Sequence, residues 1–228
     1  MKKRRYGQMS ESILVGICLA LTGGFLDAYS FICRGEVFAN AQTGNIALFG
    51  ANLFEREYVK ALKYLIPILA FAIGVFIVEE VKHRYKENKT IHWRQIVLAF
   101  EIVLLMIVGF ISKENNNMAN VIVSFVCSLQ VDSFRKVRNK TFATTMCTGN
   151  LRSGTALLCT YRVIKDKSLR SKAFDYYAII LVFIIGAGIG GICSSLFHEK
   201  SIIISIIPLI ICFLVMFIRE EKAGDIYS

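Results

Sequence analysis

Long apolar runs cover most of this chain, and they leave it few ways to fold. Eight such runs lie at roughly residues 12–33, 37–53, 61–81, 95–112, 118–134, 141–160, 174–197 and 201–218. Hydrophobic residues make up 55% of the 228 residues, and the mean hydropathy is +0.54. A soluble domain of this size cannot bury that much apolar surface, whereas a membrane protein can turn it toward lipid. The sequence therefore predicts an all-α membrane protein with a single membrane domain over residues 1–228.

The second and sixth runs differ from the others because they are rich in polar residues. Each carries the same tripeptide, as Thr43-Gly44-Asn45 and as Thr148-Gly149-Asn150. Polar groups are costly against lipid, so these runs make poor lipid-facing helices. We therefore expect about six transmembrane helices plus two re-entrant or half-helix segments that contain the tripeptides.

The two tripeptides belong to a longer duplication. Asp27 precedes the first Thr by sixteen residues, and Asp132 precedes the second Thr by the same spacing. If each copy holds three spans, the second copy is inverted relative to the first, which is a plan that secondary transporters use. We therefore predict two inverted three-span repeats, over residues 10–112 and 118–218.

The basic residues favour this topology. They gather between the apolar runs, in residues 2–5, 82–94, 135–140, 162–172 and 219–222. If the second and sixth runs enter and leave by one face, all five segments fall on the cytoplasmic side, as the positive-inside rule requires. We expect both termini to be cytoplasmic. The net charge of +10 then reflects topology, so nucleic-acid binding is not expected.

The repeated tripeptides are suited to build a polar site inside the membrane. A Thr can cap a short helix, Gly permits a tight entry that leaves amides uncovered, and Asn adds donors and acceptors. Two half-helix N-termini that face each other favour a polar or anionic group. The alternative is that both tripeptides are structural corners that pack tightly. The predicted substrate-binding residues are Gln42, Thr43, Gly44, Asn45, Thr148, Gly149, Asn150 and Arg152.

Three carboxylates lie within apolar runs, and we predict a coupling or gating role for Asp27, Asp132 and Glu101. A carboxylate in a membrane usually faces a cavity, pairs with a base or titrates. The alternative for the two aspartates is an ion pair with Arg34 or Arg138, or plain exposure at the membrane interface.

Two further features concern charge balance and packing. Arg152 matches Ala47 in the other copy, so it would neutralise an anionic ligand or Asp132, or reach toward the lipid headgroups. The glycine-rich stretch at residues 186–191 has the spacing of small residues that lets two helices approach closely.

Motifs of several enzyme classes are missing from the sequence. It contains no G-x-x-x-x-G-K-[ST], no H-E-x-x-H and no G-x-S-x-G. Its seven cysteines form no C-x-x-C pair, so they are interpreted as small buried apolar residues. We expect no cofactor and no enzymatic activity, and an intramembrane enzyme is the least favoured alternative.

Three stretches resemble the YoaK family of bacterial inner-membrane proteins, which is grouped under a domain of unknown function. They are Gly24-Phe25-Leu26-Asp27-Ala28-Tyr29-Ser30, Ala41-Gln42-Thr43-Gly44-Asn45 and Thr148-Gly149-Asn150. The resemblance extends over about residues 10–220. It implies a multi-pass protein of the bacterial cytoplasmic membrane, often with about six spans, and it supplies no substrate.

These patterns together predict a secondary transporter or permease for a small polar or anionic solute. Its central site would lie at the paired Thr-Gly-Asn half-helix N-termini. The alternative is a non-transporting membrane scaffold or regulatory protein. The expected partners are a small-molecule solute and the lipid bilayer, and the sequence leaves open whether the chain forms a homo-oligomer.

Overall fold

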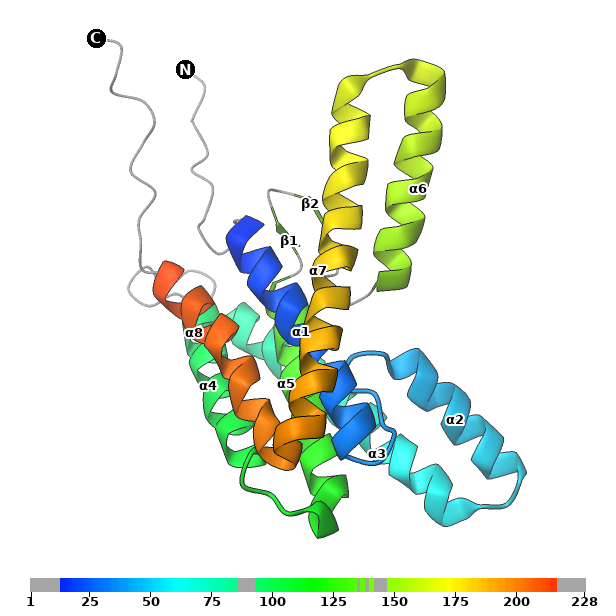
Figure 1. Cartoon of the computed structure of the whole chain (residues 1–228), viewed down its shortest axis with the longest axis vertical. Coiled ribbons are helices and arrows are strands. Elements are labelled where there is room, and N and C mark those ends of the chain that lie inside the picture. Colours follow the sequence, from blue (N-terminus) through cyan, green and yellow to red (C-terminus); the bar gives the residue numbers. More distant parts are fainter. Residues whose placement is uncertain (1–12, 86–92, 135, 138–139, 142–146, 217–228) are drawn as a thin grey trace.

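The computed structural model describes residues 13–85, 93–134, 136–137, 140–141 and 147–216, and the fold is all-α (Figure 1). Two short strands, β1 (Lys136–Val137) and β2 (Lys140–Thr141), pair antiparallel. Two 3-10 segments, η2 (Lys113–Asn115) and η3 (His198–Ser205), join α-helices. The α-helices of the described residues are α1 (Ile13–Cys33), α2 (Gln42–Phe54), α3 (Tyr58–Tyr85), α4 (Trp93–Val108), α5 (Asn116–Ser133), α6 (Cys147–Ile164), α7 (Lys167–Phe197) and α8 (Ile206–Val215).

The helices follow the apolar runs closely, with two shifts that have local causes. α2 begins at Gln42, five residues into its run, because the chain turns at Gly35 and Glu36, where φ is 81° and 62°. α7 begins well before its run because Asp166 caps it. The Asp166 carboxylate accepts a hydrogen bond from the Ser168 amide at 2.8 Å, which satisfies a free donor at the helix start.

Six of the helices alternate in direction, and α2 and α6 lie beside them (Figure 1). α1 starts where α8 ends, since Cys212 Sγ donates to the Val15 carbonyl at 3.7 Å. α5 ends near the same level, since Gln130 Nε2 donates to the carbonyl of Leu19 in α1 at 3.0 Å. α1, α4 and α7 therefore run one way, and α3, α5 and α8 return.

Three stretches are long and apolar enough to cross a membrane, namely Leu14–Cys33, Tyr58–Arg84 and Lys167–Val215. The third stretch contains α7, η3 and α8. α4, with 16 residues, is shorter than the roughly 20 residues that a spanning helix needs. By length and apolarity, the described residues thus provide three candidate spans, fewer than the six predicted.

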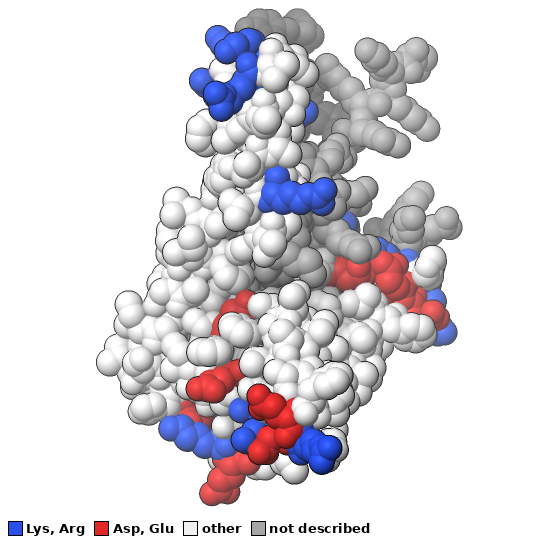
Figure 2. All heavy atoms as spheres, turned by 90° about the vertical axis from the view of Figure 1, so that its right-hand side faces the viewer, with Lys and Arg blue, Asp and Glu red and all other residues white. Residues whose placement is uncertain are grey.

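The outer surface of the bundle is unusually apolar. Large side chains such as Phe76, Ile192 and Leu196 are 73%, 65% and 66% exposed. Figure 2 shows one face, on which charged side chains gather at the lower end and in smaller groups at the upper end and on one edge at mid-height, with broad uncharged areas between them. Such a surface is suited to lipid, in agreement with the predicted membrane location.

Glycines let α1 and α7 pack with their backbones in contact. A Cβ added at Gly24 of α1 would strike the Phe183 carbonyl oxygen of α7. On α7, a Cβ at Gly186 would strike the Leu21 carbonyl oxygen, and one at Gly190 would lie 2.7 Å from the Phe25 carbonyl oxygen. The close helix contact predicted for residues 186–191 is confirmed.

Adding a side chain to this contact should therefore separate the helices. We expect Gly186→Val to lower the free energy of unfolding by about 2–3 kcal/mol. Gly188→Val is the matched control, because a Cβ at Gly188 would meet nothing within 4 Å. Thermal unfolding of both variants in detergent tests this, and equal losses of stability would contradict the backbone contact.

Candidate functional site

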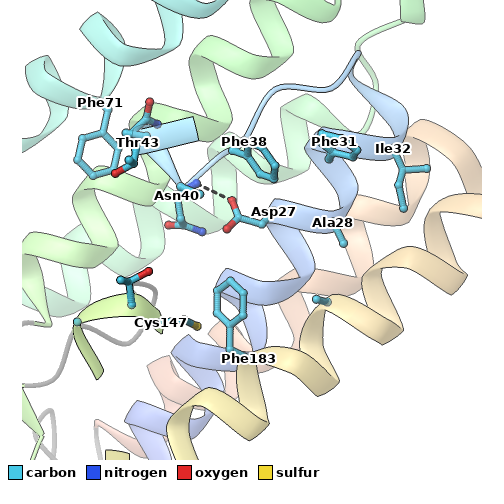
Figure 3. Close-up of a pocket in the computed structure, with 15 residues that line it drawn as sticks. Asp27, Ala28, Phe31, Ile32, Phe38, Asn40, Thr43, Phe71, Cys147 and Phe183 are labelled. Carbon is cyan, nitrogen blue, oxygen red and sulfur yellow. Dashed lines mark hydrogen bonds between the residues drawn. The ribbon is translucent and has the colours of Figure 1, made fainter. Parts of the chain in front are cut away.

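A cavity of about 770 Å³ lies where the two Thr-Gly-Asn motifs approach each other (Figure 3). Its walls come from α1, from the loop before α2, from the first residues of α2 and α6, and from α3 and α7. The lining residues are Asp27, Ala28, Phe31, Ile32, Phe38, Asn40, Ala41, Gln42, Thr43, Phe71, Cys147, Thr148, Gly149, Phe183 and Ala187.

The positions of two lining phenylalanines show how far along the bundle the cavity lies. Phe71 lies near the middle of α3, and Phe183 lies near the middle of α7, and these are the two longest helices of the described residues. Each is followed three residues later by a glycine that packs on another helix. Gly74 meets α5, and Gly186 meets α1. The cavity is therefore half-way along the bundle, framed by two Phe-x-x-Gly stretches at equivalent positions.

Asp27 is the only charged side chain among the described residues that line the cavity. It is 8% exposed, and its Oδ1 accepts a hydrogen bond from the Asn40 amide at 2.7 Å. The Asn40 side chain in turn donates to the Gly23 carbonyl at 3.1 Å. None of the ion pairs found among the described residues includes Asp27. The carboxylate thus fixes the loop before α2 and still faces the cavity.

Arg34 does not pair with Asp27, so that alternative is wrong. The Arg34 side chain is fully buried, and its Nε donates to the Tyr29 hydroxyl at 2.8 Å. Its Nη2 donates to the Val108 and Ile111 carbonyls at 3.0 and 2.9 Å. The Val108 carbonyl ends α4 and the Ile111 carbonyl lies three residues beyond it, where a helix end carries a partial negative charge. Arg34 therefore joins the end of α1 to the end of α4.

Asn45, predicted to bind the substrate, does not line the cavity. It is fully buried, and its Oδ1 accepts from the Phe38 amide at 3.0 Å while its Nδ2 donates to the Phe38 carbonyl at 2.8 Å. Nδ2 also donates to Gln42 Oε1 at 3.0 Å. The Asn45 side chain thus bonds to both backbone polar groups of Phe38, as a neighbouring β-strand would. These bonds hold the loop before α2 against the start of that helix.

The predicted capping role of Thr43 is wrong, because Ala41 is the N-cap of α2 and no side chain caps it. Thr43 instead lines the cavity from the first turn of α2. Gly44 is helical, and a Cβ there would lie 2.9 Å from the Phe38 ring. The tight turn lies at Gly35 instead, the one glycine of the described residues with positive φ.

The second motif contributes its first two residues to the same cavity. Thr148 and Gly149 line it, although Thr148 is 105 residues from Thr43 in sequence. Asn150 is buried outside the lining, and Arg152 is exposed and also outside it. Residues 142–146, which precede α6, lie outside the described residues.

The other two predicted coupling carboxylates are away from the cavity. Asp132, 3% exposed, pairs with Lys82 of α3 at 3.4 Å, and its other predicted partner, Arg138, lies outside the described residues. Glu101 of α4 is fully buried, and neither carboxylate oxygen has a hydrogen-bond partner among the described residues. Of the three carboxylates, the cavity therefore includes only Asp27.

Sequence reasoning missed the aromatic part of the lining. Four phenylalanines, Phe31, Phe38, Phe71 and Phe183, face the cavity, and the rings of Phe31 and Phe38 stack at 4.9 Å between centroids. The spacing Phe-x-x-Gly, which occurs in both halves at residues 71–74 and 183–186, is the signal that would have found two of them.

Apolar helices with a largely apolar outer surface, packed around a cavity whose lining holds one buried carboxylate, indicate an α-helical membrane protein. The family model "Protein of unknown function (DUF1275)" matches residues 15–215, so the chain belongs to that family. One relative is the UPF0700 transmembrane protein YoaK of Bacillus subtilis (strain 168), which is 25% identical to this chain over 214 residues. The alignment covers 90% of this chain and 92% of the relative. No solved structure matches the chain. The predicted resemblance to the YoaK family is confirmed.

The role of Asn45 can be separated from substrate binding by its effect on stability. We expect Asn45→Ala to cost about 1–3 kcal/mol, because it leaves the buried amide and carbonyl of Phe38 without partners. Asn52→Ala is the control, since Asn52 bonds only locally, to the Leu48 carbonyl. Thermal unfolding measures both, and an unchanged melting temperature for Asn45→Ala would contradict the loop-holding role.

Proposed function

We propose that this protein is a secondary transporter or permease of the bacterial cytoplasmic membrane, and that the cavity is its solute site. The observation that carries the proposal is the meeting of two motifs that are 105 residues apart at one cavity half-way along α3 and α7. A site at mid-depth between two halves of the chain is what alternating access requires.

The helix packing supports two inverted repeats, over residues 10–112 and 118–218. α1 packs along α7, and its counterpart α5 packs along α3. In the same way, α2 on α3 corresponds to α6 on α7, and α4 on α5 corresponds to α8 on α1. We infer six spans, formed by α1, α3, α4, α5, α7 and α8, with α2 and α6 as half-helices. Six spans also put both termini on one side, which the basic segments assign to the cytoplasm.

The cavity favours a permease over a scaffold. A scaffold or regulatory protein has no need of a cavity between the Thr-Gly-Asn corners and is expected to pack them tightly. Here a Cβ at Gly149 would meet nothing within 4 Å, and the space beside it measures about 770 Å³. This volume is within the range of small-molecule sites.

The predicted solute was either polar or anionic, and an anionic solute has less support than a polar one. Arg152, which was predicted to neutralise an anionic ligand or Asp132, is exposed and outside the lining. We therefore retain a small solute with a polar group as the proposed cargo.

Alternating access can be tested at a native cysteine, because Cys147 lines the cavity. In right-side-out and in inside-out membrane vesicles, we expect a membrane-impermeant maleimide to modify Cys147, as measured by peptide mass spectrometry. Cys127, which is fully buried, is the internal control and should stay unmodified in both. Modification from one side only, or from neither, would contradict a permease.

A further inference from the structure

The lining of the cavity also indicates which solutes it accepts. We propose that it binds an organic cation with an apolar body, and that Asp27 is the counter-charge. This rests on the proposed function in one respect, which is that the solute site and this cavity are the same.

The charge of the lining is negative. Asp27 contributes a carboxylate, and the described lining contains no Lys, Arg or His. The hydrogen bond from the Asn40 amide stabilises the carboxylate but supplies no full positive charge. An unpaired carboxylate at this depth is costly, and a bound cation would remove that cost.

The helix N-termini at the cavity do not make the charge of its lining positive. Two of the first amides of α2 are already used within the loop and first turn, since Gln42 donates to the Asn40 carbonyl at 2.8 Å and Gly44 donates to the Ala41 carbonyl at 2.9 Å. The start of α6 adds at most about half a positive charge. This is less than the full charge of one carboxylate, so an anion gains little here.

The aromatic walls suit the body of such a cation. Phe31, Phe38, Phe71 and Phe183 come from α1, the loop, α3 and α7, and they surround the space next to Asp27 (Figure 3). The face of an aromatic ring attracts a cation, and rings around a carboxylate are a recurrent way to bind an ammonium group. The negative face of an aromatic ring disfavours a simple anion.

Two probes of the same shape and opposite charge test the proposal. In phosphatidylcholine nanodiscs, with empty nanodiscs as background, we expect saturable binding of tetraphenylphosphonium and none of tetraphenylborate. Equal binding of the two ions, or preference for the borate, would overturn the proposal without the use of any variant.

Variants then test whether Asp27 supplies the negative charge that binds the cation. Asp27→Asn keeps an oxygen for the Asn40 amide and removes the charge, so it should weaken tetraphenylphosphonium binding by roughly tenfold or more. Phe183→Leu, which keeps the apolar volume, should weaken it by roughly threefold. Glu57→Gln removes an exposed carboxylate far from the cavity lining and should change nothing. An unchanged affinity for Asp27→Asn would overturn the assignment.

The thiol of Cys147 gives a second readout of the local charge. A trimethylammonium-bearing methanethiosulfonate should modify Cys147 faster than its sulfonate-bearing analogue, and Asp27→Asn should reduce that ratio. Cys159, exposed on the same helix, is the internal control, and its ratio should stay unchanged. A Cys147 ratio that Asp27→Asn leaves unchanged would count against the proposal.

Failure of this proposal is distinguishable from failure of the proposed function. If Cys147 is accessible from both sides of the membrane but the cavity ignores tetraphenylphosphonium, the permease stands and the cation selectivity is wrong. If the cation binds but Cys147 is accessible from one side only, the cavity is a cation-binding site in a protein that does not transport.

Discussion

The non-helical segment between α1 and α2 imposes the constraint on which the rest of the structure depends. Lipid offers its backbone no hydrogen-bond partners, so the protein must supply them. Asp27 accepts from the Asn40 amide, Asn45 binds both polar groups of Phe38, and Asn120 donates to the Arg34 carbonyl at 2.8 Å. These side chains come from three helices, and the segment therefore determines how α1, α2 and α5 are placed.

Asp27 joins this structural requirement to the chemistry of the cavity. The oxygen that holds Asn40 also brings a charge to the cavity wall, so the loop and the electrostatics of the site are coupled. A ligand that neutralises Asp27 would weaken its hold on the loop, because a charged acceptor forms the stronger hydrogen bond.

The sequence predicted the helices and the convergence of the two motifs, but it did not predict the partners of the polar side chains. Apolar runs and the Asp-to-Thr spacing are local patterns, and they were sufficient to place Thr43 and Thr148 at one site. The roles of Asn45 and Asp132 depend on residues brought near by packing, such as Lys82 of α3. The aromatic lining was not predicted because a Phe in an apolar run gives the same sequence pattern whether it faces lipid or a cavity.

The backbone contact between α1 and α7 has a consequence for how the chain is made. Gly24 in α1 needs Phe183 and Ala187 in α7, which are synthesised more than 150 residues later. α3 likewise packs on α5, from the other half of the chain. The first half can therefore not complete its packing until the second half is made. The glycine face of α1 therefore stays without its partner until α7 is made, and α8, which packs on α1 and α4, follows later still.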